Sequence, residues 1–232
     1  MSTVEIDTPH GRIGAELRIP DGSGPWPGVV IIHDALGPRD PHREIAQRFA
    51  DQGYLAMLPN LFSRGGAVRC IRSVFRDLNA KEGRAFDDIA AAREALENRA
   101  DCTGAVGIAG FCMGGGFALL SSTRGFGASA PFYPAPINGD YSEIFEGACP
   151  IVASYGKRDV ANRGTGPRLE RTLTELGIDH DVKVYPGVGH SFADHVPAQP
   201  IARILGFGSN QEAAEDAWRR VFAFFDEHLR AS

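Results

Sequence analysis

Residues 106–120 constrain the fold most tightly, because an apolar run, a glycine-punctuated turn and a second apolar run follow one another there. The turn reads GFCMG, with Cys112 at its centre between Gly110 and Gly114. When a strand turns this sharply into a helix, the residue at the apex adopts strained backbone angles and only small flanking residues fit. The pattern matches a nucleophile elbow with cysteine in place of serine. A buried structural cysteine in a glycine-rich connection is the alternative.

Elsewhere the chain alternates short apolar runs with segments of helical periodicity. The run VVII at residues 29–32 is typical of a parallel strand that is covered on both faces. The predicted strands are residues 3–6, 13–19, 29–33, 54–58, 105–109, 128–133, 151–155 and 182–185. The predicted helices are a segment between Pro41 and Gly53 and residues 68–78, 86–96, 113–122, 168–176 and 211–229. This alternation predicts an α/β protein with a mainly parallel, doubly wound sheet and helices on both faces.

The 232 residues match the length of one α/β domain, and no repeat or linker divides residues 1–232. The net charge of −5, from 29 acidic and 24 basic residues, gives no indication of nucleic-acid binding. The N-terminus lacks the pattern of a secretory signal, and no apolar run reaches the roughly 18–20 residues of a membrane span. The four cysteines include no C-x-x-C pair. We therefore expect a single-domain cytoplasmic protein with neither nucleic-acid nor membrane partners.

Two further candidate residues follow predicted strands, at the edge of an open parallel sheet where ligands bind. Asp159 lies in the loop after residues 151–155, and His190 lies in the loop after residues 182–185. A nucleophilic thiol needs a base, and the base needs an orienting acid. Cys112, Asp159 and His190 therefore form a candidate catalytic triad in the chain order nucleophile, acid, histidine. A turn cap for Asp159 and a surface position for His190 are the alternatives.

The loop after residues 29–33 is expected to supply one half of an oxyanion hole. We expect the backbone N–H groups of Ala35 and Met113 to be the two donors. Asp34 stands next to Ala35, and a carboxylate buried there needs a hydrogen-bond partner. Asp34 is expected to act either as a turn cap or as a partner for Cys112 or a substrate group.

Other polar residues fit the catalytic roles less well. Asp194 is a second choice for the acid, because it is close to His190 in the sequence. The spacing of His190, Asp194 and His195 matches no metal-ligand signature, so we expect no metal site. Solvent-exposed positions are expected for four other histidines, namely His10, His42, His180 and His228. A serine nucleophile is disfavoured, because no elbow contains any of the candidates Ser121, Ser122 and Ser191.

Taken together, these motifs resemble those of the dienelactone hydrolase family, a carboxymethylenebutenolidase-like group with the α/β-hydrolase fold. The resemblance extends over nearly the whole chain and rests on residues 29–37, GY at 53–54, LPNLF at 58–62, GFCMGG at 110–115, Asp159, and GHSF at 189–192. It implies a triad of Cys112, His190 and Asp159 that hydrolyses lactones or other esters through an acyl-cysteine intermediate. It also implies that the protein needs no cofactor and is a monomer.

Two positions depart from the pattern of that family. The family has a glutamate where Asp34 stands, and an arginine that holds the substrate carboxylate where Asp194 stands. A carboxylate at the second position repels the same anion. Four arginines are candidates to replace it, with surface solvation as the alternative role: Arg203, Arg69, Arg72 and Arg64. We therefore expect a small, partly apolar lactone or ester as substrate. The alternative function is that of a non-catalytic ligand-binding or thiol-sensing protein on the same fold.

Overall fold

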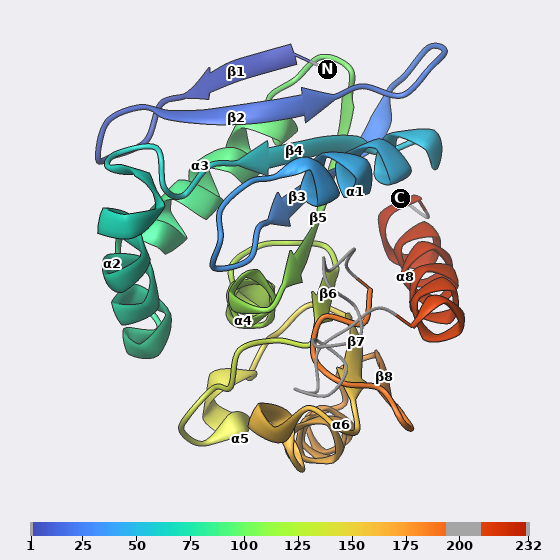
Figure 1. Cartoon of the computed structure of the whole chain (residues 1–232). Helices are drawn as coiled ribbons and strands as arrows, with labels where there is room; N and C mark the ends of the chain where they lie inside the picture. The colour runs from blue at the N-terminus through green and yellow to red at the C-terminus, as the bar shows by residue number, and fades with distance from the viewer. Residues whose placement is uncertain (1, 194–209, 231–232) are drawn as a thin grey trace.

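The computed structural model describes residues 2–193 and 210–230 and is built on an eight-stranded sheet with helices on both faces (Figure 1). The strand order is β1-β2-β4-β3-β5-β6-β7-β8. β1 and β2 pair antiparallel, β2 joins β4 antiparallel, and every later pairing is parallel. The strands are β1 (Ser2–Ile6), β2 (Ile13–Arg18), β3 (Trp26–Ile32), β4 (Leu55–Pro59), β5 (Cys102–Phe111), β6 (Ser129–Phe132), β7 (Ile151–Gly156) and β8 (His180–Tyr185). The mainly parallel, doubly wound sheet predicted from the sequence is confirmed.

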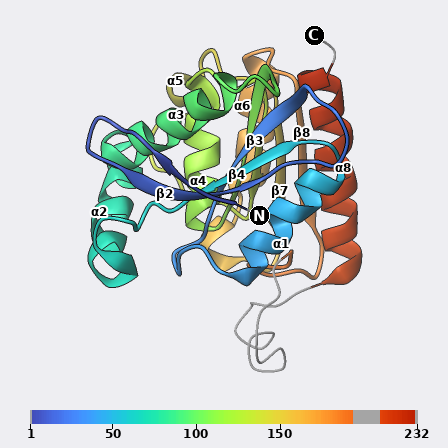
Figure 2. The same ribbon diagram turned by 90° about the horizontal axis from the view of Figure 1, so that it is seen from above.

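Two layers of helices cover this sheet, α1 and α8 on one face and the others on the opposite face (Figure 2). The helices are α1 (Asp40–Asp51), α2 (Gly66–Ala80), α3 (Arg84–Glu97), α4 (Met113–Leu120), α5 (Tyr141–Ile144), α6 (Thr165–Glu175) and α8 (Gln211–Arg230). Side chains of β3 alternate between the layers, since Val30 and Ile32 pack with the larger group of helices while Val29 and Ile31 pack against α1 and α8. All four are fully buried, which explains why this strand is continuously apolar.

The structure differs from the predicted elements mainly at their ends. The helix predicted to reach residue 122 ends at Leu120 and continues as the 3-10 turn Ser121–Thr123. The four-residue helix α5 was not predicted, because one turn is too short to show helical periodicity. Asp140 begins that helix, and its side chain accepts a hydrogen bond from the Ser142 N–H at 2.9 Å. Within the described ranges, no helix combines the length and apolar character needed to cross a membrane.

Candidate active site

Cys112 lies between the end of β5 and the first residue of α4, with backbone angles φ 54° and ψ −114°. A non-glycine residue with such angles costs about 1–3 kcal/mol and persists only where the surroundings fix it. The fixing groups are backbone hydrogen bonds. The Cys112 N–H donates to the Phe132 carbonyl at 3.1 Å, and the Cys112 carbonyl accepts from the N–H of Ala135 at 2.7 Å and of Gly116 at 3.1 Å. The turn therefore holds the half-buried thiol at the carboxyl edge of the sheet.

The two flanking glycines are required by close backbone contacts. A Cβ atom on Gly110 would lie 2.0 Å from the carbonyl oxygen of Gly114. A Cβ atom on Gly114 would lie 2.2 Å from the carbonyl oxygen of Ile32. Neither obstacle is the end of a flexible side chain, so no rotamer change relieves these contacts. The sharp turn is therefore possible only with glycine at both positions, as its sequence pattern suggested.

Asp159 and His190 meet at the same edge of the sheet, after β7 and β8. His190 Nδ1 lies 2.6 Å from Asp159 Oδ2, so the Nδ1–H donates to the carboxylate. Asp159 is almost fully buried, and its other oxygen accepts from the Ala161 N–H at 3.1 Å. The aspartate therefore caps a turn and holds the imidazole at the same time. The two roles that the sequence analysis treated as alternatives coexist in one side chain.

Asn162 is a third partner in this group, and the sequence analysis missed it. Its Nδ2 donates to Asp159 Oδ2 at 2.8 Å and to the Pro134 carbonyl at 2.9 Å. Burial alone would raise the pKa of Asp159, but the hydrogen bonds from His190 and Asn162 lower it below its ordinary value. The carboxylate therefore remains ionised although little of it reaches solvent. An asparagine three residues after the acid was the only sequence signal for this contact.

The imidazole of His190 is influenced by both Asp159 and Cys112. Nδ1 is the ring nitrogen bound to Asp159. Burial would lower the pKa of His190, but the hydrogen bonds and charges of Asp159 and Cys112 raise it to about 10. The ring of Tyr133 packs edge-on against the imidazole, with 5.1 Å between the ring centroids. Asp159 and Cys112 thus act on the same imidazole, which relates the three residues of the predicted triad to one another.

The loop after β3 places Asp34 and Ala35 beside the elbow, because the carbonyls of Ile32 and His33 contact Gly114 closely. Asp34 Oδ1 accepts from the Leu36 N–H at 2.7 Å, which is a turn-capping contact. Asp34 Oδ2 lies 2.6 Å from Arg39 Nη2 and forms an ion pair with it. Both carboxylate oxygens are therefore bound within their own loop, as expected for a turn cap, while Arg39 is a partner that the sequence analysis did not identify.

Two buried histidines lie behind this loop. The expectation that His42 is solvent-exposed is wrong, since it is 1% exposed in the first turn of α1. Its Nε2 lies 3.2 Å from the Asp34 N–H, and burial lowers the pKa of His42 to about 4. His33 is fully buried, and its Nδ1 lies 2.7 Å from the Asp34 carbonyl. Helical spacing alone does not reveal that the ring of His42 turns inward toward the end of β3.

The arginines proposed for the substrate pocket either make no ion pair or side-chain hydrogen bond with the described site residues or fall outside the described residues. Arg69 and Arg72 are exposed on α2, and neither makes an ion pair or side-chain hydrogen bond with any described site residue. Arg64 forms a buried ion pair with Asp88 at 2.6 Å and so has a structural role. Two predicted pocket residues and one histidine fall outside residues 2–193 and 210–230, namely Asp194, Arg203 and His195.

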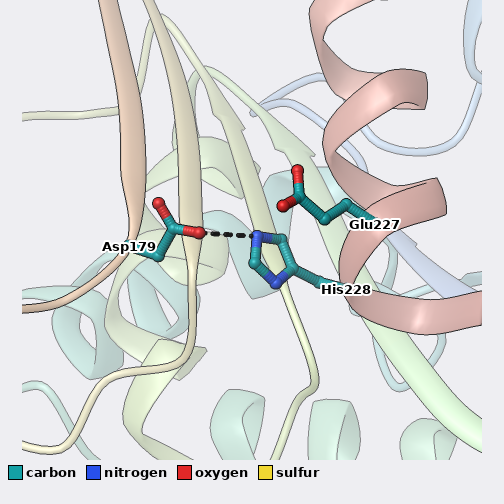
Figure 3. A group of neighbouring side chains, drawn as sticks. All are labelled: Asp179, Glu227 and His228. Carbon is teal, nitrogen blue, oxygen red and sulfur yellow. Dashed lines mark ion pairs between the residues drawn. The ribbon is translucent and has the colours of Figure 1, made fainter. Parts of the chain in front are cut away.

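In the part of the chain that the structure describes, one group of side chains has the composition of a metal site (Figure 3). The ligating atoms of Asp179, Glu227 and His228 lie within 4.8 Å of one another. Asp179 precedes β8, so the group lies at the amino edge of the sheet, opposite the elbow. Asp179 Oδ2 is 3.1 Å from His228 Nε2, and this ion pair accounts for the proximity of those two side chains. Both carboxylates are exposed, and we assign no metal to them.

This chain is similar to known proteins in sequence and in fold. A carboxymethylenebutenolidase of Rhodococcus opacus is 24% identical, over 92% of this chain and 86% of its own. Among solved structures, a dienelactone hydrolase-like promiscuous phosphotriesterase from metagenomic libraries superposes with a TM-score of 0.81 at 21% identity, covering 98% of both chains. An α/β hydrolase enzyme from a deep-sea metagenome library superposes with a TM-score of 0.71 at 16% identity, covering 99% of this chain and 98% of its own.

These structural likenesses show that the fold is the α/β-hydrolase fold, in agreement with the mainly parallel sheet and its two helical layers. The family model for the dienelactone hydrolase family matches residues 13–229, from the start of β2 to the last turn of α8. That match includes the elbow and the loops that carry the acid and the histidine. The chain belongs to the dienelactone hydrolase family.

Proposed function

We propose that this protein hydrolyses small lactones or other esters with Cys112 as its nucleophile. Membership in a hydrolase family supports the general class of reaction. The observation that carries the specific proposal is the 2.6 Å hydrogen bond between His190 Nδ1 and the buried Asp159, with Cys112 at the strained apex of the elbow acting on the same imidazole. A buried acid, an imidazole and a thiol in this order are the parts of an activated nucleophile.

In the first step, Cys112 Sγ attacks the ester carbonyl carbon and a C–S bond forms. The thiolate is the attacking form of cysteine, and His190 serves as the base for the thiol proton, so that an imidazolium stands beside the sulfur. The carbonyl π electrons move to the oxygen, and the resulting oxyanion accepts hydrogen bonds from the Ala35 and Met113 N–H groups. When the oxyanion collapses, the C–O bond to the alcohol breaks and His190 transfers its proton to the leaving oxygen.

In the second step, water hydrolyses the acyl-cysteine. His190, now neutral, takes one proton from the water as the hydroxyl oxygen attacks the thioester carbon. The second tetrahedral intermediate expels Cys112 as a thiolate, which the imidazolium again stabilises. With a lactone, the alcohol released in the first step stays attached to the acyl chain, so the product is a hydroxy acid. Asp159 holds the imidazole in one orientation and stabilises its charge in both steps.

The charge around the Asp34 loop supports a neutral or partly apolar substrate. Asp34 is compensated by Arg39, so the pair adds no net charge beside the proposed oxyanion hole. Arg69 and Arg72, exposed on α2, make no ion pair or side-chain hydrogen bond with the described site residues. We therefore propose an uncharged ester or lactone group as the part of the substrate that enters the site.

The proposal is tested with Cys112→Ala. We expect it to abolish turnover of p-nitrophenyl acetate and of a panel of lactones while the circular dichroism spectrum stays unchanged. As a matched control, Cys149→Ala removes a thiol whose pKa burial raises to about 12, and it should leave turnover unchanged. Rapid quenching of the wild type should trap an acylated Cys112 peptide that mass spectrometry detects. Wild-type rates in Cys112→Ala would rule out the cysteine mechanism.

A further inference from the structure

The peptide that joins Asp34 to Ala35 carries two groups with different partners. Its carbonyl is the Asp34 oxygen, which accepts from His33 Nδ1 at 2.7 Å and from the Gly37 N–H at 3.2 Å. Its N–H is that of Ala35, one of the two proposed oxyanion donors. A trans peptide is planar, so its C=O and N–H bonds point in opposite directions. Fixing the direction of the Asp34 carbonyl therefore fixes the direction in which the Ala35 N–H points.

The surroundings of His33 determine which of its nitrogens carries the proton. Nε2 lies 3.2 Å from the backbone N–H of Leu61, which can only donate, so Nε2 must accept. Burial lowers the pKa of His33, which favours the neutral ring. The single proton of that ring is then on Nδ1, facing the Asp34 carbonyl. The imidazole bridges the loops after β3 and β4 as one donor and one acceptor.

The ring of His33 has little freedom to move. It is fully buried, and its centroid lies 4.8 Å from that of the Phe62 ring in an edge-on contact. On the other side of Asp34, the ring of His42 accepts from the Asp34 N–H at 3.2 Å. The two histidines therefore hold both peptide groups of Asp34, and His33 holds the one that ends in the Ala35 N–H.

We propose that His33 is a positioning residue for oxyanion stabilisation, and this inference rests on the proposed function. His33 does not touch the substrate. Its Nδ1–H keeps the Asp34 to Ala35 peptide in the orientation that aims the Ala35 N–H at the developing oxyanion. Such a donor acts mainly in the transition state, so its misalignment lowers kcat and leaves KM nearly unchanged.

A pair of substitutions separates the two hydrogen bonds of His33. In His33→Asn, the side-chain Nδ2 replaces Nδ1 and keeps the donor to Asp34, but the acceptor for Leu61 is lost. In His33→Gln, the side-chain oxygen replaces Nε2 and keeps the acceptor, but the donor to Asp34 is lost. Each variant loses one buried hydrogen bond, so we expect similar falls in Tm from the two.

The expected kinetic results differ between the two variants. Deleting an oxyanion donor outright costs about 100- to 1,000-fold in kcat, so misdirecting one in His33→Gln should cost at least about tenfold. His33→Asn should retain kcat within about threefold, and KM for p-nitrophenyl acetate should change little in either variant. An alkyl trifluoromethyl ketone, which forms a tetrahedral adduct with a thiolate, should lose affinity in His33→Gln by the same factor as kcat/KM.

The outcomes distinguish this inference from the proposed function. Equal losses of kcat in the two variants, or a native kcat in His33→Gln, would overturn the role of His33 while ester hydrolysis by Cys112 stands. Turnover that survives Cys112→Ala would overturn the proposed function itself. A third measurement needs no variant to fold, because the nitrogen-15 shifts of His33 in the native protein report its tautomer. A proton on Nε2 in place of Nδ1 would also overturn the inference.

Discussion

Two histidine and aspartate pairs lie at opposite edges of the same sheet and differ in burial. At the carboxyl edge, His190 Nδ1 is 2.6 Å from Asp159 Oδ2, and the side chains are 13% and 3% exposed. At the amino edge, His228 Nε2 is 3.1 Å from Asp179 Oδ2, and that aspartate is 61% exposed (Figure 3). Water screens the second pair, whereas little water reaches the first. The ion pair between the same two residue types is therefore weaker at the amino edge, because its aspartate is exposed to water.

The neighbours of the two imidazoles differ as well. Each ring packs against an aromatic side chain, Tyr133 for His190 and Phe224 for His228. Cys112 is a further partner of His190, whereas Glu227 supplies a further carboxylate beside His228. A thiol can be activated as a nucleophile, while an exposed carboxylate adds only a charge. The third group beside each pair therefore distinguishes the candidate active site at the carboxyl edge from the surface contact at the amino edge.

The largest expected difference between the pairs is in catalysis. His190→Ala should lower kcat/KM for p-nitrophenyl acetate by about 10,000-fold or more, because the thiol loses its base and the leaving group loses its acid. His228→Ala should leave kcat/KM unchanged. Initial rates measured over a range of substrate concentrations provide the test. Similar losses in the two variants would remove the functional distinction between the pairs.

Replacing the acids gives a smaller effect of the same kind. Asp159→Asn should lower kcat by roughly 1,000- to 10,000-fold, since a neutral amide no longer stabilises the imidazolium or fixes its tautomer. Asp179→Asn is the matched control and should leave kcat at the wild-type value. Both substitutions preserve side-chain shape, so circular dichroism should confirm unchanged folds. A wild-type rate in Asp159→Asn would show that another group orients His190.

Asn162 also distinguishes the two pairs, because no amide side chain among the described residues donates a hydrogen bond to Asp179 in the way that Asn162 does to Asp159. Asn162→Ala removes the donors to Asp159 Oδ2 and to the Pro134 carbonyl. An unsatisfied buried acceptor costs about 1–3 kcal/mol, so we expect a lower Tm and a fall in kcat of roughly tenfold. Asn79→Ala, on the exposed surface of α2, is the control and should change neither. Steady-state kinetics and thermal melts measure the two effects, and an unchanged kcat would reduce Asn162 to a structural role.

A separate expected effect is a pH dependence of stability. The pKa of His190 is raised from 6.5 to about 10 in the folded protein, so folding tightens the binding of its proton. This contribution is fully present below about pH 6.5 and is lost as the pH rises through about 10. Between these pH values, the Tm of the wild type should fall more than that of His190→Ala, by roughly 2–4 °C for each kcal/mol of unfolding free energy that is lost. His228→Ala should follow the wild type, and parallel curves for wild type and His190→Ala would contradict the shift.

The sequence was sufficient for those parts of the fold that depend on local pattern. The apolar run of β3, the glycine turn around Cys112 and the helix of α8 all carry their signal within a few neighbouring residues. The positions of Asp159 and His190 after two strands followed from a general rule for parallel sheets. Their meeting at 2.6 Å agrees with that rule.

The contacts that the sequence did not reveal join side chains from different elements. The burial of His42 depends on how α1 packs behind the end of β3, and helical periodicity says nothing about that distance. Arg39 reaches back to Asp34 across a turn, and Asn162 reaches both Asp159 and the carbonyl of Pro134. Each contact is set by tertiary packing and side-chain rotamers, which a single sequence does not specify.

The hydrogen bonds at the elbow have a consequence for how this chain can change over evolutionary time. The backbone angles of Cys112 are fixed by bonds to Phe132 and Ala135 and by the bare α-carbons of two glycines, none of which involves the sulfur. The scaffold therefore specifies where a reactive side chain stands and leaves open which one it is. A single nucleotide change turns a cysteine codon into a serine codon, so one mutation can exchange the nucleophile at position 112 while the fold stays intact.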